Sequence, residues 1–169
     1  EIVEFYSDLT DEDLIPEEDL IVTLSKEGYA KTQPLDAYQA QNRGGTGKRA
    51  ASLKDEDFVS KLFVANTHDT LLCFSSYGKV YWIKVYRLPR GGRNAKGRPI
   101  VNLLPLEKDE RIQAVLPVKE FNDDQFIFMA TESGSVKKTK LSAYSRPMKS
   151  GIKAIKLREG DRVVNAEIT

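Results

Sequence analysis

Leu20-Ile-Val-Thr-Leu-Ser-Lys-Glu-Gly-Tyr-Ala-Lys31 is an apolar run, a polar turn that contains a glycine, and a second run that holds a lysine. The same pattern returns as Leu71-Leu-Cys-Phe-Ser-Ser-Tyr-Gly-Lys-Val-Tyr81 and as Phe126-Ile-Phe-Met-Ala-Thr-Glu-Ser-Gly-Ser-Val-Lys137. The turn glycines, Gly28, Gly78 and Gly134, are 50 and 56 residues apart. Self-similarity at a nearly fixed period indicates a repeat architecture.

A second element recurs in step with the first. It begins at Gly47, Gly97 and Gly151, and an apolar stretch follows each time: Phe58 to Val64, Ile112 to Val118, and Val163 to Ile168. Each repeat therefore has about four short runs rich in β-branched and aromatic residues. Four strands in roughly 50 residues is typical of a propeller blade. We predict an all-β chain of three four-stranded blades, at about residues 20–66, 67–121 and 122–169. Three blades do not close a ring of the usual four to eight.

The composition fits one domain with a hydrophobic core, because the 169 residues are 40% hydrophobic and 30% charged. No run of 18 apolar residues occurs, which excludes a membrane-spanning helix. The single cysteine, Cys73, lies in an apolar run, and we expect it to fill the core. A lone cysteine also fits a reducing cytoplasm.

Charge is distributed unevenly along the chain. Residues 1–25 hold nine acidic side chains and no Lys or Arg, so the other 144 residues hold 26 basic and 16 acidic side chains, a net charge of +10. Such an asymmetry favours a polyanionic partner. We interpret residues 1–19 as an acidic linker that either tethers the domain or competes with the polyanion for its basic surface.

The basic residues gather at the same place in each repeat. Residues 70–106 and 133–158 contain no acid, and both windows cover the strand after the turn glycine and the loop that follows it. We therefore predict a basic rim along one edge of every blade, which suits the phosphates of bent duplex DNA without reading base sequence. The alternative is a solvated surface of mixed charge. The predicted rim residues are Lys31, Arg49, Lys79, Lys84, Arg87, Arg90, Arg93, Lys96, Arg98, Lys137, Lys138, Lys140, Arg146, Lys149 and Lys153.

The most specific short motif is a glycine-rich octet, which reads Gln41, Asn42, Arg43, Gly44, Gly45, Thr46, Gly47 and Lys48. Its three glycines let the backbone turn sharply. It is not a P-loop, because Arg49 stands where Ser or Thr is required and no helical pattern follows. A dinucleotide-binding loop is excluded by the lack of a βαβ context. A plain flexible turn is the alternative on spacing alone.

The octet resembles the Gln-x-Arg-Gly-Gly-x-Gly-Lys box of the C-terminal domain of the DNA gyrase A subunit, in the type IIA topoisomerase family. The resemblance continues through residues 64–69, 72–76, 97–106, 128–131 and 136–139, so it covers essentially the whole chain. It implies a β-pinwheel, a propeller-like ring of six blades that exchange strands. Three repeats then correspond to half of that ring.

The resemblance also implies a function. The domain wraps duplex DNA on its rim and presents it to the cleavage core, which supports negative supercoiling, and wrapping depends on the box, Gln41 to Lys48. Asn42 and Thr46 stand where family members often have a basic residue, so the charge of the box is lower here. In an A2B2 assembly of this family, the catalytic tyrosine lies in the N-terminal part of the A chain and the ATPase lies in the B chain. No catalytic residue, cofactor or metal is therefore expected in this chain, and its place is the cytoplasm, at the nucleoid.

Three rival interpretations remain. The related domain of topoisomerase IV bends DNA but has a degenerate box, whereas the octet here is nearly complete. A propeller-like scaffold for proteins predicts binding that is insensitive to salt. An enzyme is disfavoured, because the only histidine, His68, precedes Asp69 without a nucleophile or metal-ligand cluster nearby, and we predict a turn there.

Overall fold

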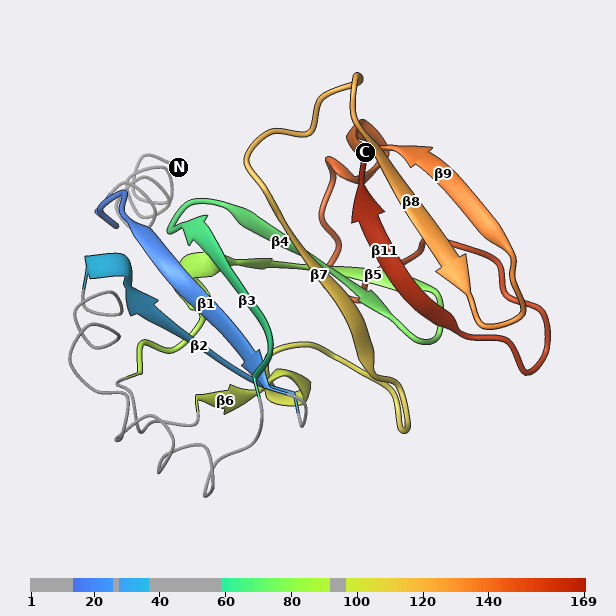
Figure 1. Cartoon of the computed structure of the whole chain (residues 1–169), viewed down its shortest axis with the longest axis horizontal. Coiled ribbons are helices and arrows are strands. Elements are labelled where there is room, and N and C mark those ends of the chain that lie inside the picture. Colours follow the sequence, from blue (N-terminus) through green and yellow to red (C-terminus); the bar gives the residue numbers. More distant parts are fainter. Residues whose placement is uncertain (1–13, 26–27, 37–58, 92–96) are drawn as a thin grey trace, which may run out of the picture. The chain divides into compact units, whose positions relative to one another are not determined.

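A computed structural model describes residues 14–25, 28–36, 59–91 and 97–169, which form three β-sheets (Figure 1). The chain divides into two compact units. One comprises Glu1–His68 and Val85–Arg98, and the other comprises Asp69–Lys84 and Pro99–Thr169.

The first unit contains a four-stranded sheet in the order β3-β1-β2-β6. Its strands are β1 (Asp19–Ser25), β2 (Tyr29–Pro34), β3 (Val59–Asn66) and β6 (Arg98–Pro99). The inner strand β1 is buried on both faces, so its apolar residues do not alternate with exposed ones: Leu20, Ile21, Val22 and Leu24 are at most 7% exposed. A 3-10 turn, η1 (Val85–Arg87), belongs to the same unit.

The second unit contains two sheets, in the orders β10-β5-β4-β7 and β11-β8-β9. Their strands are β4 (Thr70–Ser75), β5 (Lys79–Lys84), β7 (Ile112–Val118), β8 (Phe126–Thr131), β9 (Val136–Lys140), β10 (Ile152–Lys153) and β11 (Val163–Ile168). Two 3-10 turns, η2 (Ile100–Asn102) and η3 (Leu141–Tyr144), complete the unit.

The three repeated turns have one geometry. In each, the glycine N–H donates to the carbonyl of a Ser or Thr three residues earlier, at 3.0–3.1 Å. The hydroxyl of that residue accepts the N–H that follows the glycine, at 2.9–3.3 Å. The pairs are Gly28 with Ser25, Gly78 with Ser75, and Gly134 with Thr131. All three glycines have φ between 81° and 94°, the left-handed region that glycine adopts without steric cost. The polar turn residues therefore close the same hairpin three times.

Two short strands are exchanged between repeats. β6 follows Gly97 of the second repeat but extends the first sheet beside β2, and β10 follows Gly151 of the third repeat but extends the second sheet beside β5. Both glycines have positive φ, 86° and 75°. A Cβ on Gly97 would overlap the Ala30 carbonyl, and one on Gly151 would lie 2.6 Å from Cε1 of Tyr81. Only glycine lets these strands approach so closely, which explains why this element recurs in the sequence.

The core of the second unit lies between its two sheets. Leu72 and Phe74 of β4 belong to the same buried apolar cluster as Ile127 and Met129 of β8, and each is at most 1% exposed. The Phe74 and Tyr144 rings pack edge to face, 5.9 Å between centroids. Each sheet buries its apolar face against the other, and neither sheet could bury that face alone.

The structure assigns places to the residues that the sequence left open. Cys73 is wholly buried, as predicted, and Tyr81 is a core residue at 1% exposure. Trp82 is half-buried and donates its indole N–H to the Tyr144 carbonyl at 2.8 Å. Tyr77 is exposed, and its hydroxyl donates to the Lys108 carbonyl at 2.7 Å.

The predicted all-β class with three antiparallel sheets is confirmed. β7 and β11 coincide with the predicted apolar stretches. One difference concerns the third sheet, which has three strands in the described part of the chain instead of the four predicted. The fourth strand of each earlier sheet comes from the following repeat, so a count of runs within one repeat assigns that strand to the wrong sheet.

Candidate nucleic-acid interface

Eight of the predicted rim residues lie on strands at one edge of the described sheets. In the first two sheets, the strand after the turn glycine and the exchanged strand beside it form the edge opposite the third strand of the repeat, and in the third sheet β9 alone forms that edge. These outer strands, β2, β5, β6, β9 and β10, hold eight Lys or Arg and no acid. The other six strands hold one Lys, one Asp and one Glu. The described sheets therefore concentrate positive charge at one edge.

Several predicted residues lie outside the described residues. They are the whole box (Gln41, Asn42, Arg43, Gly44, Gly45, Thr46, Gly47 and Lys48) and Arg49, Arg93 and Lys96. Arg98 is placed by its backbone in β6.

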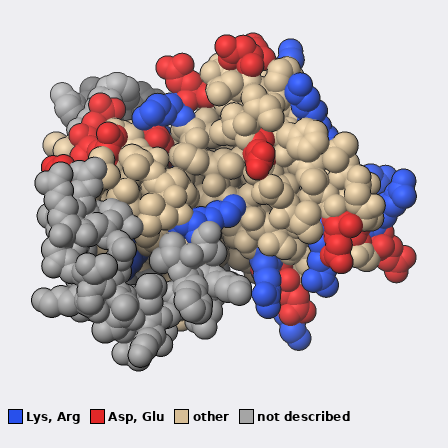
Figure 2. All heavy atoms as spheres, viewed as in Figure 1, with Lys and Arg blue, Asp and Glu red and all other residues tan. Residues whose placement is uncertain are grey.

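The third sheet presents its cations on an edge strand. Lys137, Lys138 and Lys140 of β9 are exposed, and in Figure 2 Lys and Arg atoms lie along the side of the molecule that β9 occupies in Figure 1. The Lys138 ammonium lies 4.4 Å from the centroid of Phe126, a cation–π distance that holds its stem against the sheet. Lys137 donates to the Ala154 carbonyl at 2.9 Å. Arg146 and Lys149, beyond η3, are also exposed.

The second sheet places two lysines directly opposite each other. β10 pairs with β5 so that Lys153 faces Lys79, although the two residues come from different repeats. Like charges in this position are destabilising, and neighbouring DNA phosphates, each accepting a charge-assisted hydrogen bond from one lysine, would relieve the repulsion. Lys84 lies at the other end of β5. This lysine pair is the clearest candidate for an anion-binding feature in the described part of the chain.

The first unit contributes Lys31, Arg87 and Arg90. Lys31 lies half-buried on β2, and Arg87 is exposed at the end of η1. Arg90 forms an ion pair with Glu18, and their side chains are 51% and 36% exposed. An exposed pair of this kind contributes only about 0–1 kcal/mol. A phosphate can therefore displace Glu18 at little cost.

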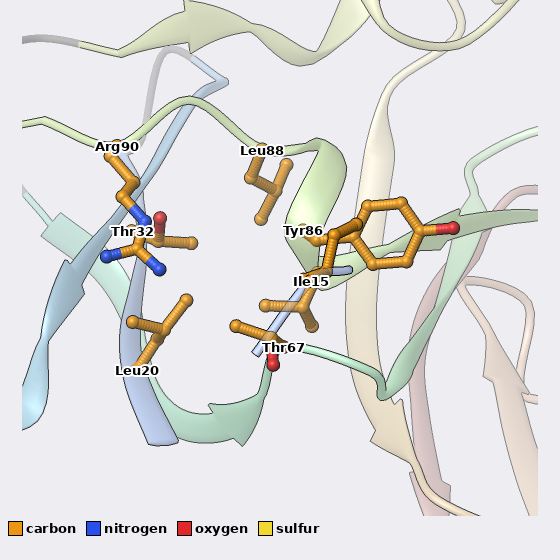
Figure 3. Close-up of a pocket in the computed structure, with 8 residues that line it drawn as sticks. Ile15, Leu20, Thr32, Thr67, Tyr86, Leu88 and Arg90 are labelled. Atoms are coloured by element: carbon orange, nitrogen blue, oxygen red, sulfur yellow. The ribbon is translucent and has the colours of Figure 1, made fainter. Parts of the chain in front are cut away.

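A pocket of about 130 Å³ lies beside Arg90, lined by Ile15, Leu20, Thr32, Thr67 and residues of the η1 segment (Figure 3). Its floor is largely apolar, and its walls are fixed by hydrogen bonds. Thr67 donates its hydroxyl to the Pro16 carbonyl at 2.8 Å, and the ring Nε2 of His68 lies 2.8 Å from the Ile15 carbonyl oxygen. These bonds attach the last residues of the acidic segment to the first sheet.

His68 and Asp69 contact different partners. His68 lies in the turn before β4, as predicted, and Asp69 forms an ion pair with Lys119 at 3.4 Å. No group of three or more His, Cys, Asp or Glu able to hold a metal ion occurs among residues 14–25, 28–36, 59–91 and 97–169. Within those same ranges, no helix is long and apolar enough to cross a membrane.

Sequence reasoning missed two features of the second unit. Arg111 and Arg162 immediately precede β7 and β11, and both line an open depression with Tyr77. Their acidic neighbours, Asp109-Glu110 and Asp161, kept them out of the acid-free windows. The second feature is a buried carboxylate, Glu110, which accepts from the Tyr81 hydroxyl. A short acidic run in a sequence predicts a solvated loop, so nothing in the sequence indicated that the Glu110 side chain is buried.

Comparison with known proteins places this fold in one family. A family model described as "DNA gyrase C-terminal domain, beta-propeller" matches residues 19–66, 69–119 and 125–169. The chain belongs to the DNA gyrase C-terminal domain family. The three matched segments of the gyrase family model follow the three repeats, and each contains the hairpin of one repeat and the strand that pairs with the first strand of that hairpin.

The relatives agree with membership of the gyrase family. The DNA gyrase A chain of Aeromonas salmonicida is 62% identical over 94% of this chain and 17% of its own length, and that of Salmonella typhimurium is 57% identical over the whole chain and 19% of its own length. Among solved structures, the C-terminal domain of DNA topoisomerase IV has a TM-score of 0.76 at 32% identity, covering 92% of this chain and 47% of that domain. A DNA gyrase A C-terminal domain has a TM-score of 0.61 at 25% identity, covering 90% and 48%. The chain thus spans about a fifth of the gyrase A chains that it matches.

Proposed function

We propose that this chain binds and wraps duplex DNA on the outer strands of its sheets, without sequence specificity, and so supports negative supercoiling by DNA gyrase. The observation that carries the proposal is the concentration of eight cations and no acid on the outer strands. Cations in a row along sheet edges neutralise successive phosphates, and the release of condensed counterions supplies the binding free energy. Phosphates carry no base identity, so such an edge bends DNA of any sequence.

The remaining assignments follow from this role. We propose that residues 20–66, 67–121 and 122–169 act as three blades, half of a six-bladed ring, and that residues 1–19 join them to the cleavage core. In this scheme the domain is non-catalytic and needs no cofactor or metal. Its partners are double-stranded DNA, the N-terminal cleavage domain and the gyrase B chain of an A2B2 holoenzyme, in the cytoplasm at the nucleoid.

The salt dependence of DNA binding tests the proposal. The double variant Lys79→Ala/Lys153→Ala removes both members of the facing pair, so the log–log slope of affinity against salt is expected to fall in magnitude by about 1.8, or about 0.9 for each lost phosphate contact. Binding of a labelled duplex is measured by anisotropy between about 50 and about 200 mM salt.

The matched control is Lys108→Ala/Arg111→Ala, which removes two exposed cations outside the outer strands. Its slope is expected to stay close to that of the unmodified chain. Binding that does not depend on salt, or an equal fall in the control, contradicts the proposal and favours a protein-interaction scaffold.

The Glu18–Arg90 ion pair leads to a separate prediction about the acidic segment. Replacing Glu18 by Ala frees Arg90 for a phosphate, so we expect tighter DNA binding and a slope steeper by about 0.9. Glu17→Ala is the matched control, because Glu17 is exposed and carries the same charge. In an Arg90→Ala background the Glu18 substitution is expected to have no such effect. Equal gains from both glutamate variants would mean that the segment acts only through its net charge.

A further inference from the structure

A buried tyrosine–glutamate pair lies beneath the facing lysines of the second sheet. The Tyr81 hydroxyl lies 3.0 and 2.9 Å from the two carboxylate oxygens of Glu110 and donates to that carboxylate. Tyr81 is 1% exposed and Glu110 is 6% exposed. Glu110 also accepts the Glu107 N–H at 2.8 Å. Both donors are neutral, so the carboxylate is held by hydrogen bonds and not by an ion pair.

The donor is available at any physiological pH. Burial, followed by the hydrogen bond to Glu110, raises the pKa of Tyr81 well above its usual range, so the phenol keeps its proton. The loop that supplies Glu110 is tight: the Glu110 N–H donates to the Glu107 carbonyl at 3.1 Å, and Asp109 has a φ of 67°. A non-glycine residue with this φ needs surrounding contacts to hold it. The Tyr81–Glu110 bond is such a contact.

The ring of Tyr81 also supports the exchanged strand. A Cβ on Gly151 would lie 2.6 Å from Cε1 of Tyr81, so the glycine backbone rests directly on the ring. The two residues after Gly151 are β10, where Ile152 pairs with Val80 and Lys153 pairs with Lys79. The Lys79 ammonium lies 6.0 Å from the centroid of the same ring. One side chain thus contacts the segment that carries Lys153 and faces the ammonium of Lys79.

Comparison of the repeats shows why a tyrosine matters at this position. The third residue after the turn glycine is Lys31 in the first repeat and Lys137 in the third, but Tyr81 in the second. Lys137 uses its ammonium on the Ala154 carbonyl, at 2.9 Å. In the second repeat the phenol satisfies the buried carboxylate without adding charge, and the lysine stands two residues earlier, at Lys79.

We propose that Tyr81 and Glu110 are positioning residues for DNA wrapping. Their hydrogen bond fixes the Tyr81 ring under Gly151, and the ring holds Lys153 opposite Lys79, so that the two lysines bind neighbouring phosphates of the DNA. The proposal rests on the proposed function. Neither residue contacts DNA, and both act through the lysine pair.

The test is a mutant cycle read by salt dependence. Tyr81→Phe keeps the ring and removes the donor, and we expect the slope to fall in magnitude by between about 0.9 and about 1.8, as contact with one or two phosphates is lost. In a Lys79→Ala/Lys153→Ala background, Tyr81→Phe is expected to cause no further fall. Glu110→Gln retains a carbonyl oxygen that both donors can reach, so the salt slope is expected to stay unchanged. Glu110→Ala removes that acceptor, and the salt slope is expected to fall as it does in Tyr81→Phe.

The outcomes separate the two proposals. If the lysine double variant lowers the slope but Tyr81→Phe and Glu110→Ala lower only the melting temperature, the pair is merely structural and this inference is wrong. An additive effect of Tyr81→Phe in the lysine-free background overturns it as well. If Tyr81→Phe fails to fold, the Glu110→Gln and Glu110→Ala comparison decides. An unchanged slope in the lysine double variant itself counts against the proposed function.

Discussion

Replacing all eight box residues, Gln41 to Lys48, by alanine is expected to abolish wrapping of duplex DNA while leaving measurable binding. Only two of the eight residues, Arg43 and Lys48, carry charge, so the salt slope falls by no more than about 1.8. The cations of the outer strands remain and continue to attract the duplex. Bending 20–30 base pairs, however, costs on the order of 1–6 kcal/mol, and a surface that has lost part of its contacts no longer offsets that cost.

Wrapping is measured as the change in linking number that the bound chain leaves in a relaxed and resealed circle. The control is Arg43→Ala/Lys48→Ala, which removes the same charge but keeps Gly44, Gly45 and Gly47. If the control loses only part of the linking-number change, the rest of the loss in the eight-residue variant is due to the glycine backbone. Undiminished wrapping in the eight-residue variant would remove the box from the mechanism.

Substituting Gly151 by alanine is expected to lower the free energy of unfolding by about 2–5 kcal/mol. The left-handed φ of 75° costs an alanine about 1–2 kcal/mol, and forcing a Cβ against the buried Tyr81 ring adds about 1–3 kcal/mol. For a chain of this size, the melting temperature is expected to fall by about 4–20 °C. Loss of the β10–β5 pairing should also weaken DNA binding, since Lys153 is then no longer held opposite Lys79.

Gly134→Ala is the matched control for this substitution. Gly134 has a φ of 94°, but nothing lies within 4 Å of its missing Cβ. Its replacement therefore costs only the backbone term, about 1–2 kcal/mol. Thermal melts of both variants are compared, and the difference between their losses of stability reports the cost of the contact between the new Cβ and the Tyr81 ring. Equal losses of stability would show that the Tyr81 ring yields to the new methyl group.

Local chemistry made the hairpins predictable. A Ser or Thr followed three residues later by glycine closes each turn, and alternation or apolar runs define the flanking strands. The same reasoning located the basic residues that lie on the outer strands, because strands after the turn recur at one position in every repeat. Both predictions depend on residues close together in the sequence.

The features that escaped prediction depend on distant partners. A two-residue strand such as β10 has no pattern that says which sheet it joins, and its partner strand, β5, ends 68 residues earlier, at Lys84. Glu110 looks like part of a solvated acidic loop until Tyr81 is placed above it. Arg90 reads as an available cation, and its pairing with Glu18 spans 72 residues. Only the folded chain brings such groups together.

The exchanged strands make the completion of each of the first two sheets depend on the repeat that follows it in the sequence. The first sheet acquires its fourth strand only after Arg98–Pro99 has been synthesised, and the second only after Ile152–Lys153. During translation each of the first two sheets therefore remains one strand short until the next repeat emerges. A substitution at Gly151 is therefore expected to disturb the preceding sheet, because β10 forms the edge of that sheet. The described part of the third sheet consists of β8, β9 and β11 and does not include β10.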